Sequence, residues 1–326
     1  MFGKLMNNYY YGKSGKGDYK RDDLPRNRWQ LFWEMLRIRF SGLFRLNLMT
    51  AIAFIPLMYV MILLVNSLFS HLVGITEALA DPEQAELAAK LVADSPQQIY
   101  NILFSTLVLA IPAIAITGPV QAGMAYITRN WARDEHAFIW SDFKDAVKEN
   151  WKQALAISAI TGLVPLIMLV CWQFYGGMAQ TNGMFFVVPQ VLTMALGVIW
   201  MMSLVFMYPM MVTYKMSLMT LIRNSLLLSI GRLPQTVGVR LVMLIPTAIA
   251  ALVAFYTPYM MYAVMALAGY YVMLGNALAR FVHASFTNAT FDRYINPRIA
   301  GVEVNRGLSS EDDYEDEDTL EEESEV

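Results

Sequence analysis

The stretch LNLMTAIAFIPLMYVMILLVNSLF, residues 46–69, decides the fold class of this chain. It holds 24 residues without a single charge. A helix needs about 20 consecutive apolar residues to cross the hydrocarbon core of a bilayer, where the backbone must satisfy its own hydrogen bonds. Residues 46–69 therefore predict a membrane-spanning helix.

Five further apolar blocks follow this one. The whole chain of 326 residues is 56% hydrophobic, only 16% charged and has a mean hydropathy of +0.41. The sequence thus predicts an all-α integral membrane protein with six transmembrane helices. The other predicted spans are residues 102–127, 154–175, 185–208, 241–256 and 259–278.

The distribution of lysine and arginine predicts the orientation. The segments outside the spans hold, in chain order, ten, one, five, none, four, none and four of these residues. Basic segments stay on the cytoplasmic side, so both termini are expected in the cytoplasm. Lys13 and Lys16, in a segment that lacks the glycine spacing of a nucleotide-binding loop, are interpreted as topology determinants and as contacts to anionic lipid of the inner leaflet.

Three cytoplasmic stretches look alike. WQLFWEMLRIRFSGLFRLNL, WSDFKDAVKENWKQALAISA and LMTLIRNSLLLSIGRLPQTV each precede an odd-numbered span. Each carries two apolar residues spaced eight apart, which lie on one helical face. We expect three transmembrane hairpins, each preceded by an amphipathic cytoplasmic elbow helix. The spaced pairs are Phe32 with Phe40, Phe143 with Trp151, and Ile222 with Ile230.

The remaining segments complete the expected organisation. Residues 1–28 form a basic cytoplasmic segment, residues 29–285 the transmembrane domain, and residues 286–326 a cytoplasmic tail. The tail is strongly acidic and is expected to be disordered from residue 309. In the first external loop, Asp81 and Pro82 predict the start of a short helix lying over the outer mouth.

No recognised catalytic or metal-binding pattern is present in the sequence. The predicted spans carry no ionisable residue near their centres, where such residues usually mark function. His71, His136 and His283 lack ligand spacing, and Cys171 is the single cysteine. A non-enzymatic protein without cofactor or metal is therefore expected. Because the basic segments are explained by the membrane, no nucleic-acid partner is expected either.

The second predicted span is interrupted by proline and glycine, and two interpretations stay open. Interrupted helices near the midplane are typical of transporter sites, whereas small residues also allow close helix packing. In the first case a cavity would form beside this span. Its candidate residues are Pro112, Thr117, Gly118, Pro119, Gln121, Gly123 and Asn276.

The stretch after the second span is the candidate partner or lipid surface. It mixes basic, acidic and aromatic residues on the side predicted to be cytoplasmic. The candidates, besides Lys13 and Lys16, are Arg129, Asn130, Trp131, Arg133, Asp134, His136, Trp140, Asp142 and Phe143.

Three stretches give the chain a family resemblance. YGKSGKGDY with LPRNRWQLFWE, then TGPVQAGMAYITRNWARDEHAFIWSDFKDAVKENWKQAL, and YPMMVTYKMSLMTLIRNSLLLSIGRLP resemble the YesL-like family of bacterial multi-pass membrane proteins. The resemblance implies a plasma-membrane protein of unknown biochemical function, encoded beside ABC-type sugar importers and polysaccharide-degrading enzymes. It brings no established functional residues.

Three functions follow as hypotheses. The first is an accessory or regulatory protein of carbohydrate uptake that contacts ABC importer subunits. The alternative is a stand-alone transporter of a small neutral solute through a cavity beside the second span. The third, a lipid-modifying enzyme, would need a phosphate-sized pocket beside Asp134–Asp142. The sequence gives no prediction of ligand or oligomeric state.

Overall fold

The computed structural model of the chain describes residues 25–308. The predicted lipid contacts Lys13 and Lys16 and the acidic tail from residue 309 lie outside the described residues. Regular structure in the described part is helical. The elements are α2 (Arg28–Ala80), η2 (Pro82–Gln84), α3 (Ala85–Trp131), α4 (Ser141–Asn182), η3 (Met184–Phe186), α5 (Val187–Thr213), α6 (Leu218–Gly231), α7 (Leu233–Tyr256), α8 (Met260–Tyr270), a π-helical turn η4 (Tyr271–Gly275), α9 (Asn276–Tyr294) and η5 (Asn296–Arg298).

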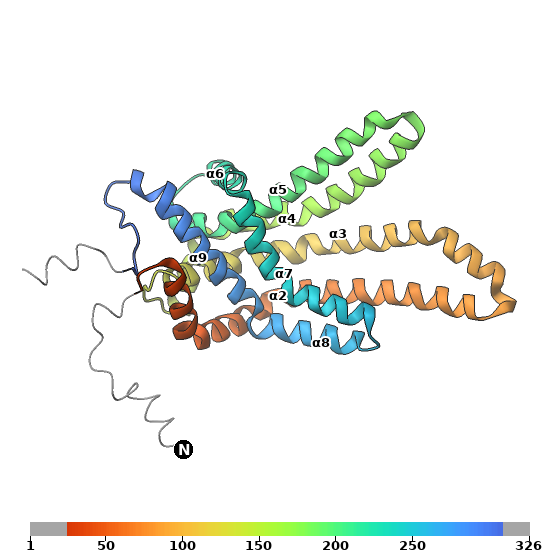
Figure 1. The fold of residues 1–326 in the computed structure, drawn as a ribbon, viewed down its shortest axis with the longest axis horizontal. Coiled ribbons are helices and arrows are strands. Elements are labelled where there is room, and N and C mark those ends of the chain that lie inside the picture. Colours follow the sequence, from red (N-terminus) through yellow and green to blue (C-terminus); the bar gives the residue numbers. More distant parts are fainter. Residues whose placement is uncertain (1–24, 309–326) are drawn as a thin grey trace, which may run out of the picture.

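Six of the helical segments in the described part are long and apolar enough to cross a membrane, which confirms the predicted fold class at this level. Their connections alternate between two ends of the molecule. The turns from α2 to α3, from α4 to α5 and from α7 to α8 point to one end, whereas the start of α2, α6 and the end of α9 gather at the other (Figure 1).

The helices are longer than the predicted spans. The first span was expected over 46–69, but α2 runs for 53 residues from Arg28 to Ala80. It starts early because the Asn27 side chain accepts hydrogen bonds from the backbone N–H groups of Trp29 and Gln30, at 3.1 and 2.9 Å, and so caps the helix. At about 1.5 Å per residue, α2 far exceeds the thickness of a bilayer core.

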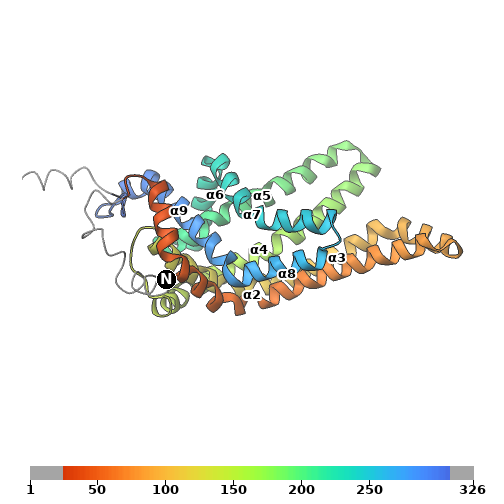
Figure 2. The same ribbon diagram turned by 60° about the horizontal axis from the view of Figure 1, so that its bottom comes forward.

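The segment between the first two predicted spans agrees with the prediction in part: Asp81 accepts a hydrogen bond from the Glu83 N–H at 3.0 Å and caps η2, which begins at Pro82. Instead of forming a separate helix over the outer mouth, residues from Ala85 onward are the first turns of α3. They pack along α2, where Ala78 and Ala88 are both buried, and His71 Nε2 lies 2.7 Å from Ser95 Oγ. Small residues let the two helices approach, so the hairpin simply continues as a long projecting arm (Figure 2).

The first two expected elbows are also parts of longer helices. Residues of the first elbow form the beginning of α2, and those of the second form the beginning of α4. The third elbow alone is a separate helix in the described part, α6, capped by Ser217. It is separate because the helix ends at Gly231 and a new helix, α7, begins at Leu233 with Pro234 in its first turn.

The two larger buried clusters of the described residues each join several helices. In the first, Trp131 of α3 and Phe281 of α9 pack with Leu43 and Leu46 of α2. In the second, residues 204–211 of α5 pack against α3, α4, α6 and α9. By contrast, Thr236 is the buried residue of α7 and Ala263 that of α8, so these two helices present apolar side chains outward, as lipid-facing helices do.

Candidate functional site

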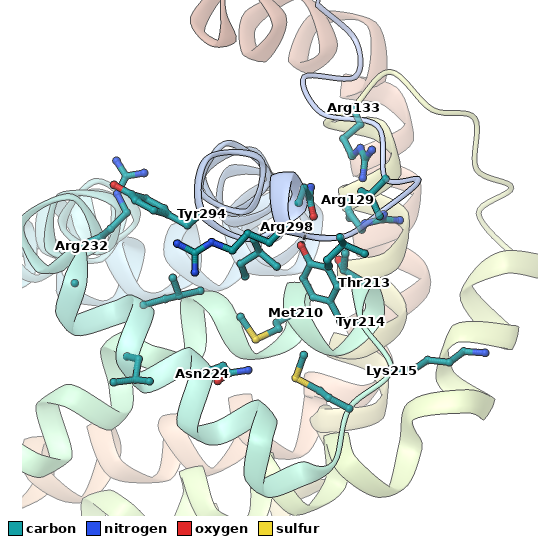
Figure 3. A pocket seen from close by; sticks show the side chains of 18 residues that line it. Arg129, Arg133, Met210, Thr213, Tyr214, Lys215, Asn224, Arg232, Tyr294 and Arg298 are labelled. Atoms are coloured by element: carbon teal, nitrogen blue, oxygen red, sulfur yellow. Dashed lines mark hydrogen bonds between the residues drawn. The ribbon is translucent and has the colours of Figure 1, made fainter.

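A cavity of about 950 Å³ lies at the end of the bundle where α6 and the end of α9 meet (Figure 3). The end of α3, the segment after α5, α6 and residues 294–302 form its walls. None of the described residues that line it is acidic, and its basic residues are Arg129, Arg133, Lys215, Arg232 and Arg298.

Helix α3 supplies two of these arginines from its last turn and the residues that follow it. Arg129 Nη1 donates to Asn130 Oδ1 at 3.0 Å, while its buried Nε has no hydrogen-bond partner. Arg133 is only 6% exposed, and its Nε lies 3.4 Å from Glu135 Oε1 without the geometry of a hydrogen bond. Both guanidinium groups therefore keep unused donors beside the cavity.

Tyr214, just after α5, stands next to these arginines in Figure 3. Its hydroxyl donates to Asn296 Oδ1, and its ring packs edge-on against Phe291. Burial, and to a lesser extent the Asp292 carboxylate, raise the pKa of Tyr214 to about 12, against the opposing effect of Arg129 and Arg133. The phenol is therefore a neutral hydrogen-bonding group at physiological pH.

The opposite side of the cavity carries Arg232, Tyr294 and Arg298 (Figure 3). Arg232 Nη1 donates to Thr290 Oγ1 at 3.2 Å, and its guanidinium lies 5.4 Å from the Phe286 ring centroid. These contacts fix Arg232 at the junction of α6 and α7. Arg298, in η5, is exposed.

The carboxylates near the cavity are already paired. Asp292 forms an ion pair with Arg28 and accepts a hydrogen bond from Asn296 Nδ2. Glu135 lies 3.4 Å from Arg133 and 3.3 Å from Arg306. Glu135 offsets part of the charge of Arg133, but the described lining holds five basic residues and no acidic one, so the cavity keeps a net positive charge that suits an anionic ligand bearing phosphate or carboxylate.

No group of three His, Cys, Asp or Glu side chains within residues 25–308 could hold a metal ion. The basic lining of the cavity supports binding of an anion by arginine and tyrosine. In the described part of the chain, the lining offers hydrogen-bond donors but no acidic general base.

The predicted partner surface needs correction, because much of it is buried. Asn130, Trp131 and Arg133 are 3–6% exposed, and Phe143 packs onto the first core cluster. Arg129 and Arg133 face the basic cavity instead of an open surface. Asp142 Oδ2 accepts from the Phe138 N–H at 2.9 Å ahead of α4. The residues of this set that remain exposed are Asp134, His136 and Trp140.

The Pro/Gly stretch of α3 is closely packed. A Cβ atom added to Gly118 would lie 2.1 Å from Ser158 Oγ, and one added to Gly123 would lie 2.5 Å from the Phe143 ring. Gln121 Nε2 donates to Thr117 Oγ1 at 2.9 Å, within the same helix. These contacts with α4 favour the packing interpretation of the stretch.

Two other members of the predicted cavity set lie apart from this packing. Pro112 is exposed, and Asn276, on α9, donates to the carbonyl of Tyr271 at 3.3 Å. Asn276 thus serves the π-helical turn. Pro119 is half-buried within α3.

Sequence reasoning missed Tyr214, Lys215, Arg232 and Arg298 as site residues. All four lie in segments that the charge count had assigned to the cytoplasm. The shared location of basic residues at one face was the signal that could have found them. Their convergence depends on the end of α9 returning to the end of α3, which the local pattern does not encode.

Comparison with known proteins gives one family match. Residues 98–172, which include most of α3 and of α4, match the model of a family described as "Protein of unknown function, DUF624". No curated protein and no solved structure matches the chain. The matched segment contains Arg129 and Arg133, so this similarity extends to one wall of the basic cavity.

Proposed function

We propose that the chain is a non-enzymatic, multi-pass protein of the bacterial plasma membrane that acts as an accessory or regulatory partner of an ABC-type carbohydrate importer. The observation that carries this proposal is the basic cavity, whose arginine, lysine and tyrosine side chains suit an anionic ligand. The resemblance to the YesL-like family supplies the link to carbohydrate uptake, and the match over residues 98–172 is compatible with it.

The proposed topology has three transmembrane hairpins and both termini in the cytoplasm. The distribution of lysine and arginine supports this orientation. The cavity would then open to the cytoplasm, where phosphorylated sugars are found, and a ligand there could report on sugar supply. Arginine pairs with phosphate through two parallel hydrogen bonds, so four arginines favour a phosphate ester over a neutral sugar.

The lipid-modifying enzyme is a weaker hypothesis. None of residues 134–142 lines the basic cavity, so the acidic groups that this chemistry needs lie elsewhere. The stand-alone transporter is also a weaker hypothesis, because side chains and backbone of α4 fill the space beside Gly118 and Gly123, where its cavity would lie. Uptake of a neutral solute by proteoliposomes that contain the purified chain alone would support the transporter hypothesis.

The partner is tested by recovering the tagged full-length chain from native membranes in mild detergent and quantifying the proteins that accompany it. We expect permease or ATPase subunits in stoichiometric amount. Recovery of the chain alone would contradict the accessory role. The exposed residues Asp134, His136 and Trp140 are the positions to substitute next, since they remain open to a partner.

The ligand site is tested separately with the purified full-length chain. Inorganic phosphate and a hexose 6-phosphate should each raise its thermal midpoint, and Arg298→Gln should weaken this response. Arg293→Gln is the matched control, because Arg293 is an exposed arginine near the same helix end that does not line the cavity. An equal response in both variants would remove the cavity from the proposal.

A further inference from the structure

A second group of basic side chains lies inside the bundle, away from the basic cavity. It consists of Arg240 from α7 and of Arg280 and His283 from α9, packed against α5. The Arg280 guanidinium lies 4.4 Å from the ring centroid of Tyr208. Arg240 Nη2 donates to the Met201 carbonyl at 2.6 Å, and His283 is only 4% exposed. Arg240 and Arg280 therefore both pack against α5, and His283 is buried one turn after Arg280 on α9.

Several polar atoms of this group are buried and lack a partner. Arg240 Nε, Arg280 Nη1 and both ring nitrogens of His283 have no hydrogen-bond partner. Burying a charged donor without a partner costs several kcal/mol, so such atoms usually mark a missing ligand or a structural water. Arg240 and Arg280 both contact α5, at Met201 and Tyr208, and both carry unpartnered donors, which suits an anion better than a single water.

The three helices that carry or contact this group, α5, α7 and α9, offer no free carboxylate beside it. Neither α5 nor α7 contains an aspartate or glutamate. In α9 the one carboxylate is Asp292, which is twelve residues from Arg280, about 18 Å along the helix axis, and is paired with Arg28. The contacts of Arg240 and Arg280 with α5 therefore leave a local positive charge.

The outer side of the same region is apolar and open. On α7, the residues that follow Arg240 include Leu241, Leu244 and Ile245, which are 51–59% exposed, and Met201 of α5 is 36% exposed. In the membrane these side chains contact acyl chains. A ligand with a phosphate group and an adjoining hydrocarbon part would match both the arginines and this surface.

We propose that Arg240 and Arg280 bind the phosphate of an anionic phospholipid headgroup between α5, α7 and α9. The two guanidinium groups donate hydrogen bonds to the phosphate oxygens, and the His283 ring lies at the inner side of the site. The acyl chains run along the exposed residues of α7. This lipid site is separate from the basic cavity and does not depend on the accessory role.

Native mass spectrometry of the detergent-purified full-length chain tests this proposal. With phosphatidylglycerol added stepwise, the wild type should retain one lipid per chain that survives collisional activation. Arg280→Gln should weaken this binding about ten- to hundredfold, because one charge-assisted contact is lost. Arg45→Gln is the matched control, since Arg45 is an exposed arginine just before the first predicted span. Equal lipid retention in the wild type and Arg280→Gln would overturn the site.

Additional variants and a competition experiment complete the test of the lipid site. Arg240→Gln repeats the test if Arg280→Gln does not fold, and Arg280→Lys should keep part of the affinity because it keeps the charge. Inorganic phosphate, added as a competitor, distinguishes the source of the phosphate. If it displaces the lipid and binds at the same arginines at millimolar concentration, the site is one for free phosphate and the lipid assignment is wrong.

Discussion

The side-chain oxygen of Asn47 in α2 accepts a hydrogen bond of 2.8 Å from the backbone N–H of Ala277, in the first turn of α9. The same side chain donates to the carbonyls of Tyr271 and Val272, at 2.8 and 2.7 Å. A π-helical turn disturbs the regular backbone ladder, and Asn47 bonds the groups that this turn leaves free. Asn47 thereby ties α2 to the π-helical turn, where Asn276 also donates to the Tyr271 carbonyl.

We expect Asn47→Leu to destabilise the chain by about 1–3 kcal/mol, because a side chain of similar volume leaves buried backbone groups unpaired. Thermal unfolding in detergent, followed by size-exclusion chromatography, measures the change. Asn66→Leu is the control, as Asn66 lies on an exposed side of the same helix. Equal midpoints for the two variants would show that Asn47 does not hold the turn.

Two glycine-to-alanine substitutions, one at the contact and one away from it, test the packing of α3 against α4. Gly118→Ala places a Cβ 2.4 Å from the Ala154 backbone carbonyl oxygen, which cannot move aside as a flexible side chain would. We expect a loss of about 1–3 kcal/mol from this overpacking. Gly177→Ala, with no heavy atom within 4 Å of its added Cβ, should be neutral or slightly stabilising in its helix. A cavity beside α3 would instead let Gly118→Ala fold with unchanged thermal stability.

The spans could be predicted from the sequence, whereas the helix ends could not. Apolar length alone decides whether a helix can cross a bilayer, so residues 46–69 sufficed for α2. Its true start depends on the Asn27 cap, and its extension past residue 69 depends on packing against α3. Such ends are set by tertiary contacts as well as by local hydropathy.

In the candidate site, too, the residues could be predicted from the local sequence but their arrangement in space could not. Arg129 and Arg133 could be singled out because they stand among polar residues after a span. Their positions depend on contacts with distant residues: Asn288 donates to the Arg129 carbonyl, and Gly307 lies against the Arg133 carbonyl. Likewise, Arg240 and Arg280 are forty residues apart in sequence, and both reach α5, at Met201 and Tyr208, only through helix packing.

The pKa of Tyr214 gives a pH-dependent prediction. Its ordinary value of 10.0 is raised to about 12, so the folded chain keeps the phenol proton at a pH where the unfolded chain loses it. The stability contributed by this group is complete below about pH 10 and is lost as the pH rises from about 10 to about 12. The wild type should therefore lose more stability than Tyr214→Phe over that range.

Thermal midpoints at about pH 8 and about pH 11 measure this difference. At the lower pH, Tyr214→Phe should unfold earlier, because the hydrogen bond to Asn296 is lost. The gap between the two proteins should narrow at the higher pH. A constant gap would mean that Tyr214 does not titrate with folding.

The ion pair of Arg28 and Asp292 joins the start of α2 to the end of α9, beside the basic cavity. The Asp292 side chain is 4% exposed and that of Arg28 is 27% exposed. Arg28→Gln leaves a buried carboxylate without its cation, which should cost about 3–5 kcal/mol. Asp292→Asn should also destabilise the chain, but the double variant should be less unstable than the sum of the two. Thermal and denaturant unfolding of all four proteins give this coupling energy.

For comparison, the pair of Arg306 and Glu303, with side chains 51% and 70% exposed, should show a coupling near zero. If the two cycles gave equal coupling, burial of Asp292 would not be what makes its pair with Arg28 important.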